Sequence, residues 1–182
     1  MKKILLAAAV AVALVGCSKD YVKDVQNAKL DVDQSVTIGQ AMDRVSLCAK
    51  GSQKWTQDEK SSVVEFTCSD NSVKEWLSGL SKLPEFNELK PEQKALFDVK
   101  STTLSVKFNA PVDGKPVSVA SVSRTIEWAD GVKKPFEAKG ETEKQIKNLY
   151  ANEPQAKVED AGKLGNLMQL GIWTNLAASI RK

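Results

Sequence analysis

Apolar and polar residues alternate in two parts of the chain, and this period of two predicts β-strands. Residues 54–68 predict a hairpin of two short strands, the first of which carries Trp55. Residues 99–139 predict a three-stranded antiparallel meander, because two Asp-Gly pairs, which favour tight reversals, interrupt the alternation. The apolar positions change parity near residues 120–121, and we expect a β-bulge there to return them to one face of the sheet.

The register of the last two predicted strands depends on the turn at the second Asp-Gly pair. If these two residues alone form the turn, Glu127 lies opposite Lys134 and Arg124 lies opposite Glu137. Both pairs join opposite charges, and such cross-strand pairs stabilise a sheet. We therefore expect this register.

Apolar residues recur every three or four positions elsewhere, which predicts helices. The first helix follows Thr37, which forms a capping box with Gln40. A second helix occupies much of residues 70–83, and two more are expected at 141–151 and 158–180. The sequence therefore predicts an α+β fold, in which helices pack on one face of an antiparallel sheet.

One folded domain is expected over residues 35–182. It comprises a helix–hairpin–helix subregion at 35–83, the meander at 99–139 and C-terminal helices at 141–181.

The apolar set of the last predicted helix is broader than one stripe. One face holds most of these residues, and three more extend beyond it. The first group is Leu164, Leu167, Met168, Ile172, Leu176 and Ile180; the second is Leu170, Trp173 and Ala177. Such a helix either packs across the sheet or presents a surface to a partner or a membrane. Its polar residues interrupt it too often for a transmembrane span.

The first sixteen residues have the pattern of a signal peptide, with Lys2 and Lys3 before an apolar run that is short for a permanent membrane span. Small residues then precede Cys17, and Leu14-Val15-Gly16-Cys17 resembles the lipobox of bacterial lipoproteins. The resemblance implies cleavage before Cys17 and acylation of its thiol, with palmitate-type chains that anchor the protein to a membrane. The alternative is an ordinary signal peptide followed by an incidental cysteine.

Ser18 bears on which membrane holds the anchor. In enteric lipoproteins that this segment resembles, an aspartate at this position commonly retains the protein in the inner membrane, so Ser18 implies the periplasmic face of the outer membrane. Residues 17–34 are polar and weakly patterned. They predict a flexible, lipidated tether, with room for a short helix at 21–28.

The net charge bears on the class of partner, and the cysteine content bears on whether the protein has a disulfide. Loss of Lys2 and Lys3 with the signal peptide lowers the formal charge from +3 to +1, and no run of Lys or Arg predicts a nucleic-acid partner. After Cys17 only Cys48 and Cys68 remain. In an oxidising compartment they predict a structural disulfide, which stabilises the fold by about 3 kcal/mol in the chain-entropy model. A buried free pair and a redox site are the alternatives, although the wide spacing argues against a Cys-x-x-Cys oxidoreductase.

The chain contains no histidine, which excludes Ser-His-Asp and Cys-His catalysis and removes the commonest zinc ligand. Neither a calcium loop nor a glycine-rich phosphate loop is present in the sequence. We therefore predict no catalytic residue, no metal site and no cofactor. A hydrolase that uses a carboxylate pair is the enzymatic alternative.

One segment resembles known lipoproteins. VTIGQAMDRVSLC, followed by Lys54-Trp55 and then VVEFTC, resembles a module of small bacterial and prophage envelope lipoproteins of undefined activity. The order of a helix and Trp-bearing antiparallel strands is also similar to the small lipoprotein subunit of the outer-membrane barrel-assembly machine, which lacks this cysteine pair. The resemblance covers residues 35–68, implies an interaction module and transfers no catalytic residue.

These observations predict a non-enzymatic, lipid-anchored envelope protein that binds another envelope protein. The alternative is a prophage-type protective lipoprotein, which blocks a phage receptor or inhibits a lysozyme. Membrane contact through the lipid anchor is expected in either case.

Overall fold

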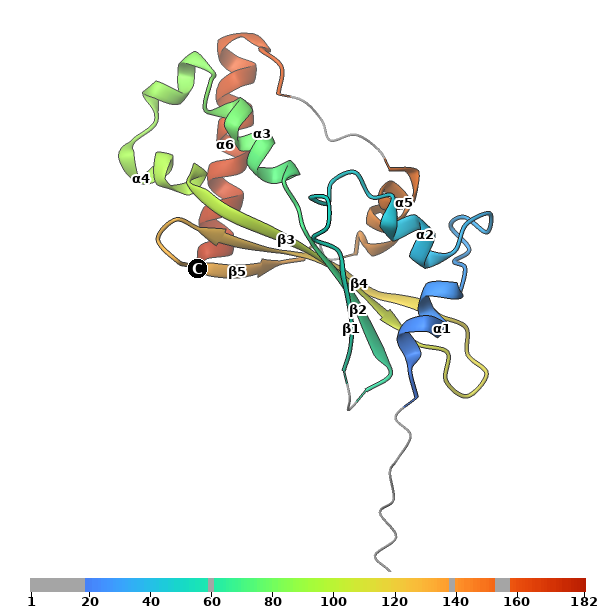
Figure 1. The fold of residues 1–182 in the computed structure, drawn as a ribbon. Helices are drawn as coiled ribbons and strands as arrows, with labels where there is room; N and C mark the ends of the chain where they lie inside the picture. The colour runs from blue at the N-terminus through green and yellow to red at the C-terminus, as the bar shows by residue number, and fades with distance from the viewer. Residues whose placement is uncertain (1–18, 59–60, 138–139, 153–157) are drawn as a thin grey trace, which may run out of the picture.

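The protein folds around one five-stranded antiparallel sheet, in which each strand pairs with its neighbours in the sequence (Figure 1). The structure is a computed structural model, which describes residues 19–58, 61–137, 140–152 and 158–182. The strands are β1 (Lys54–Gln57), β2 (Val63–Ser69), β3 (Val99–Asn109), β4 (Ser118–Trp128) and β5 (Lys133–Phe136). Both predicted strand groups therefore belong to one sheet, and the predicted α+β fold is confirmed.

Helices precede, interrupt and follow the strands. They are α1 (Tyr21–Asn27), α2 (Ile38–Asp43), α3 (Ser72–Leu80), α4 (Pro91–Lys94), α5 (Thr142–Ala151) and α6 (Gly162–Arg181), with 3-10 turns η1 (Pro84–Glu88) and η2 (Ala95–Phe97). The capping box predicted at the start of α2 is present: Gln40 N donates to Thr37 Oγ1, and Thr37 N donates to Gln40 Oε1.

The buried apolar side chains of the sheet share one face, and the helices pack against that face. Two apolar clusters divide it. The first cluster joins α1, α2 and α5 to one half of the sheet, through residues that include Val25, Met42, Phe66, Phe108 and Ile146. The second joins α3, α6 and the 3-10 turns to the other half, through residues that include Leu80, Phe97, Trp128, Leu170 and Trp173.

The bulge predicted in β4 is confirmed. Lys107 pairs with Ser121 and Phe108 pairs with Val119, so Ala120 is the extra residue. Because of this bulge, Val119 and Val122 lie on the same face of the sheet, and both contact the first cluster.

The predicted register between β4 and β5 is wrong by one residue. Glu127 pairs with Lys133 rather than Lys134, and Arg124 pairs with Phe136 rather than Glu137. The hairpin has a three-residue loop in place of a two-residue turn, because Trp128 N donates to Val132 O. Its last residue, Gly131, has φ of 85°, which a glycine adopts without strain.

The structure also differs from the tether predicted at 17–34. Residues 21–27 form α1, and the side chain of Val25 is fully buried in the first cluster together with Leu30. The apolar residues of this segment are few, but they lie on one side of a short helix and are enough to attach it to the sheet. Residues 1–18, which include the predicted signal peptide and Cys17, lie outside the described residues.

Candidate functional site

The large hydrophobic side chains that are exposed in the described residues all lie on α6. The side chains of Leu164, Met168 and Ile172 are 82%, 66% and 59% exposed, and they follow one another at intervals of four residues. We call these three side chains the α6 stripe. Four-residue spacing places them on one side of the helix, so they form a continuous apolar strip.

The stripe lies on the face of α6 that holds most of its apolar residues, for which the sequence left open packing across the sheet or presentation to a partner or a membrane. The buried residues include Leu170, Trp173 and Ala177, which the sequence pattern placed outside that face. Two polar residues, Asn166 and Thr174, are buried with them. Their presence makes the inner face look more polar than the outer one, so hydrophobic periodicity alone does not identify the inner face.

Specific hydrogen bonds hold α6 in this orientation. The indole Nε1 of Trp173 donates to the backbone oxygen of Leu96 at 3.1 Å, and the indole of Trp128 donates to the same oxygen at 3.0 Å. At the other end of the helix, Asn166 Nδ2 donates to Glu85 Oε2 and to Asp160 Oδ1, both at 2.9 Å. Buried polar groups that lack partners are costly, so these bonds disfavour rotation of the helix about its axis.

Charged side chains lie at both ends of the helix that carries the stripe, and none lies within the stripe. Residues 164–180 contain no charged side chain. Just before them, Lys163 Nζ lies 2.9 Å from Glu88 Oε1; just after them, Arg181 pairs with Asp130 and lies over the ring of Trp128. An open hollow of about 340 Å³ adjoins the stripe and is lined by residues that include Gly165, Met168 and Ile172.

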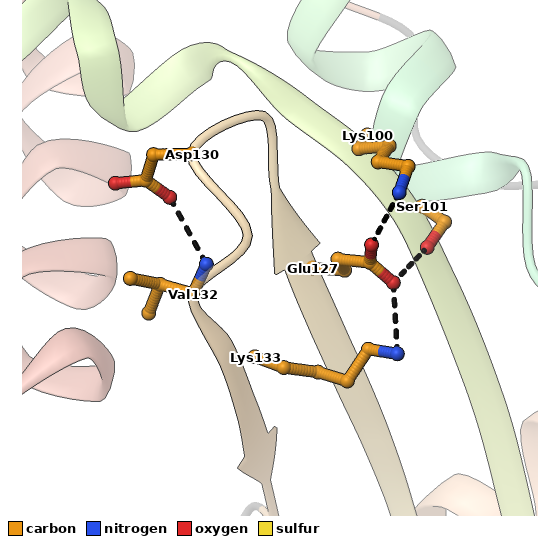
Figure 2. Close-up of polar contacts among 6 residues, drawn as sticks. All are labelled: Lys100, Ser101, Glu127, Asp130, Val132 and Lys133. Atoms are coloured by element: carbon orange, nitrogen blue, oxygen red, sulfur yellow. Dashed lines mark hydrogen bonds and ion pairs between the residues drawn. The ribbon is translucent and has the colours of Figure 1, made fainter.

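A polar cluster surrounds Glu127, on the face of the sheet opposite to the one that the helices cover (Figure 2). Lys100 Nζ lies 2.6 Å from Glu127 Oε1, Lys133 Nζ lies 2.9 Å from Oε2, and Ser101 Oγ donates to Oε2 at 3.3 Å. The hydrogen bonds from the two lysines lower the pKa of Glu127 from 4.5 to about 2. A carboxylate that stays ionised and fully hydrogen-bonded is a poor proton donor at neutral pH, so this cluster fits a structural role.

A partly buried ion pair lies between the two apolar clusters. Arg124 Nε donates to Asp70 Oδ2 at 2.7 Å; the Asp70 side chain is fully buried, whereas that of Arg124 is partly exposed. Asp70 also accepts hydrogen bonds from the backbone N and the hydroxyl of Ser72, at the start of α3. The pair links the start of α3 to β4.

The sequence did not predict this pair. We predicted only that Asp70 lies at the start of a helical segment, and we paired Arg124 with Glu137. The only available signal was the polar residue within the apolar alternation of β4, since Arg124 has the parity of Val122 and Ile126.

The predicted disulfide is confirmed. Cys48 and Cys68 are bonded, with their Cα atoms 5.5 Å apart, and they tie the segment after α2 to β2. Both side chains are buried in the first cluster, well away from the α6 stripe. Cys17 lies outside the described residues, so the structure brings none of the predicted site residues to the stripe.

Within the described ranges, no three His, Cys, Asp or Glu side chains are arranged to hold a metal ion. Among the helices of the described part of the chain, none is long and apolar enough to cross a membrane.

Comparison of the chain with protein-family models, with curated proteins and with solved structures finds no match.

Proposed function

We propose that this protein is a lipid-anchored cell-envelope protein that binds another protein through the α6 stripe. The observation that carries the proposal is the exposure of Leu164, Met168 and Ile172 on a rigidly held helix. Burial of apolar surface stabilises a complex by about 25 cal/mol per Å², and clustered apolar side chains on a surface mark interaction sites.

The chemistry of the surface defines the partner. Because residues 164–180 carry no charge, a charged group placed opposite them would lose its water without gaining a counter-ion. The matching surface is therefore an uncharged apolar groove or helix face.

The anchor supports a protein rather than the anchoring bilayer as this partner. Figure 1 shows α6 and the first described residues, before α1, at opposite ends of the molecule. The proposed lipid is attached to Cys17, just before the first described residue. Its acyl chains would therefore enter the membrane at the end of the molecule remote from α6. The lipobox resemblance and Ser18 support the periplasmic face of the outer membrane as the location.

Photo-crosslinking in intact cells tests the proposal. A photoreactive side chain at position 168 should give a discrete adduct, and the same side chain at exposed Lys144 on α5 is the matched control. Leu164→Ser and Ile172→Ser together should remove the adduct, whereas Lys147→Ser and Asn148→Ser, both exposed on α5, should not.

Exposed substitutions of this kind change the free energy of unfolding by no more than about 0.5 kcal/mol, so loss of the adduct would not reflect unfolding. If position 168 gives no adduct that position 144 lacks, the protein-binding proposal is wrong.

A further inference from the structure

The fold begins almost immediately after the proposed lipidation site. Gln57 Nε2, in β1, donates to the backbone oxygen of Lys19 at 3.0 Å, and Tyr21 N donates to Gln57 Oε1 at 2.8 Å. Asp20 caps α1 by accepting a hydrogen bond from Val22 N at 3.1 Å. The chain is therefore attached to the sheet from Lys19 onward.

Covalent geometry limits how far the acylated residue can lie from this attachment. Two peptide units separate Cys17 from Lys19, and each spans 3.8 Å between Cα atoms, so the two Cα atoms lie within about 7.6 Å of each other. A lipid on Cys17 thus holds the backbone of Lys19 beside the headgroups of the leaflet that contains the acyl chains. The domain has no tether long enough to lift it away.

The surface around Lys19 contains groups that suit phospholipid headgroups. An open hollow of about 650 Å³ is lined by Lys19 and Asp24 and by the loop between β3 and β4, including Lys115. Figure 1 shows α1 and this loop side by side at one end of the molecule. Residues 113–116 of the loop are exposed, as is Lys19. We call α1, Lys19 and residues 111–117 the basal end.

We propose that the basal end rests directly on the phospholipid headgroups of the anchoring leaflet and holds α6 away from that membrane. This rests on the proposed acylation of Cys17. Lys19 and Lys115 supply positive charge for headgroup phosphates, and Asp24, which lies 3.4 Å from Lys19, supplies an acceptor for the ammonium of an ethanolamine headgroup. The lipid thereby fixes the orientation of the domain as well as its location.

Fluorescence quenching in vesicles tests this orientation. The acylated full-length protein would be placed in vesicles of phosphatidylethanolamine and phosphatidylglycerol that carry a quencher on their headgroups. A fluorophore would be attached to Lys115→Cys in one sample and to Ile172→Cys in another. The native cysteines do not compete, since Cys48 and Cys68 are bonded and Cys17 is acylated. We expect several-fold stronger quenching at position 115 than at position 172.

A second variant keeps the lipid and changes only the connection. A Gly/Ser insertion of about 15 residues between Ser18 and Lys19 has a root-mean-square length of about 20 Å, and it should abolish most of the difference between the two positions.

Flotation with the vesicles separates the premise from the inference. Failure of the protein to float would overturn the proposed anchor and this orientation with it. Flotation with equal quenching at the two positions, or with stronger quenching at position 172, would overturn the orientation alone.

Discussion

Thr102 and Tyr150 each bury a hydroxyl group that has no hydrogen-bond partner among the described residues. Thr102 lies in β3, where its backbone oxygen accepts a hydrogen bond from Asp70 N, and it is 3% exposed. Tyr150 borders the first cluster, where burial raises the pKa of its hydroxyl to about 12. An unsatisfied buried polar group costs about 1–3 kcal/mol, so both hydroxyls lower the stability of the fold.

Thr102→Val should therefore stabilise the protein. Valine keeps the shape and β-branching of threonine and removes the unpaired oxygen, so we expect the free energy of unfolding to rise by about 1 kcal/mol. Urea unfolding of the two proteins measures the difference. Thr103→Val, at an exposed position of the same strand, is the control and should change little. A decrease with Thr102→Val would mean that its hydroxyl has a partner.

The lowered pKa of Glu127 predicts how the stability of the fold depends on pH. Its folded pKa of about 2 lies below the ordinary value of 4.5, so the folded state releases this proton more readily than the unfolded state. The stabilisation from its two lysines is complete above about pH 5 and is lost as the pH falls toward 2. Stability measured at pH 7 and pH 3 should therefore fall less in Glu127→Gln than in the wild type.

The same exchange at exposed Glu92 on α4 serves as the control for this titration. If Glu127→Gln and the wild type lose equal stability between the two pH values, the lysine contacts do not persist in solution.

At the scale of the element, α6 shows which features of a helix a sequence pattern predicts and which it does not. The extent of the helix was predicted to within a few residues, but its inward face was not, because the polar side chain of Asn166 is buried through hydrogen bonds to groups outside the helix. Those partners lie in η1 and in the segment before α6, and local hydrophobic periodicity does not indicate them. The strands of the meander were predictable for the opposite reason: their alternation and their Asp-Gly pairs are local.

Substitutions on the two faces of α6 should differ sharply in effect. Trp173→Ala removes an indole that is 3% exposed and contacts Trp76 and Phe97, so we expect a loss of about 3–5 kcal/mol in the free energy of unfolding. Met168→Ala, on the stripe, should change it by no more than about 0.5 kcal/mol. Thermal and urea unfolding measure both. Similar losses in the two variants would mean that the stripe is covered in the folded monomer.

The disulfide adds a covalent link where backbone hydrogen bonds already join the segment after α2 to the end of β2. Cys48→Ala together with Cys68→Ala opens a loop whose ends are 20 residues apart in the sequence, and we expect about 3 kcal/mol less stability. The double variant should retain its circular dichroism spectrum at low temperature, since both side chains remain small and apolar. Reduction of the wild type should reproduce the loss; if it does not, the stabilisation comes from the buried sulfur atoms rather than from the covalent bond.

For the whole molecule, the proposed anchor and the domain are separable. Cys17→Ser should yield a folded protein that no longer floats with membranes, because the domain from Lys19 onward has its own core. Membrane fractionation and the circular dichroism spectrum of the released protein measure the two effects. Retention of the variant in the membrane fraction would show that another part of the chain holds it there.

Prediction from sequence succeeded at this scale where one residue type or one spacing decides the outcome. The disulfide, the helix cap at Thr37 and the bulge at Ala120 are examples. The prediction of a flexible tether was wrong because a few apolar residues, chiefly Val25 and Leu30, attach a mainly polar segment to the first cluster. The candidate site could not be predicted fully, in part because the exposure of a side chain depends on how the two apolar clusters assemble. No single segment of the sequence determines it.

The order of the strands leaves the sheet with β1 and β5 at its edges, and both are only four residues long. An open edge can recruit a strand from a neighbouring molecule and begin aggregation. Here β5 carries Lys133, Lys134 and Pro135, and proline cannot donate a hydrogen bond to an incoming strand. Such edges resist strand addition, and this would matter for a protein that the proposed anchor concentrates at a membrane surface. Crowded copies would remain separate molecules rather than grow into fibrils.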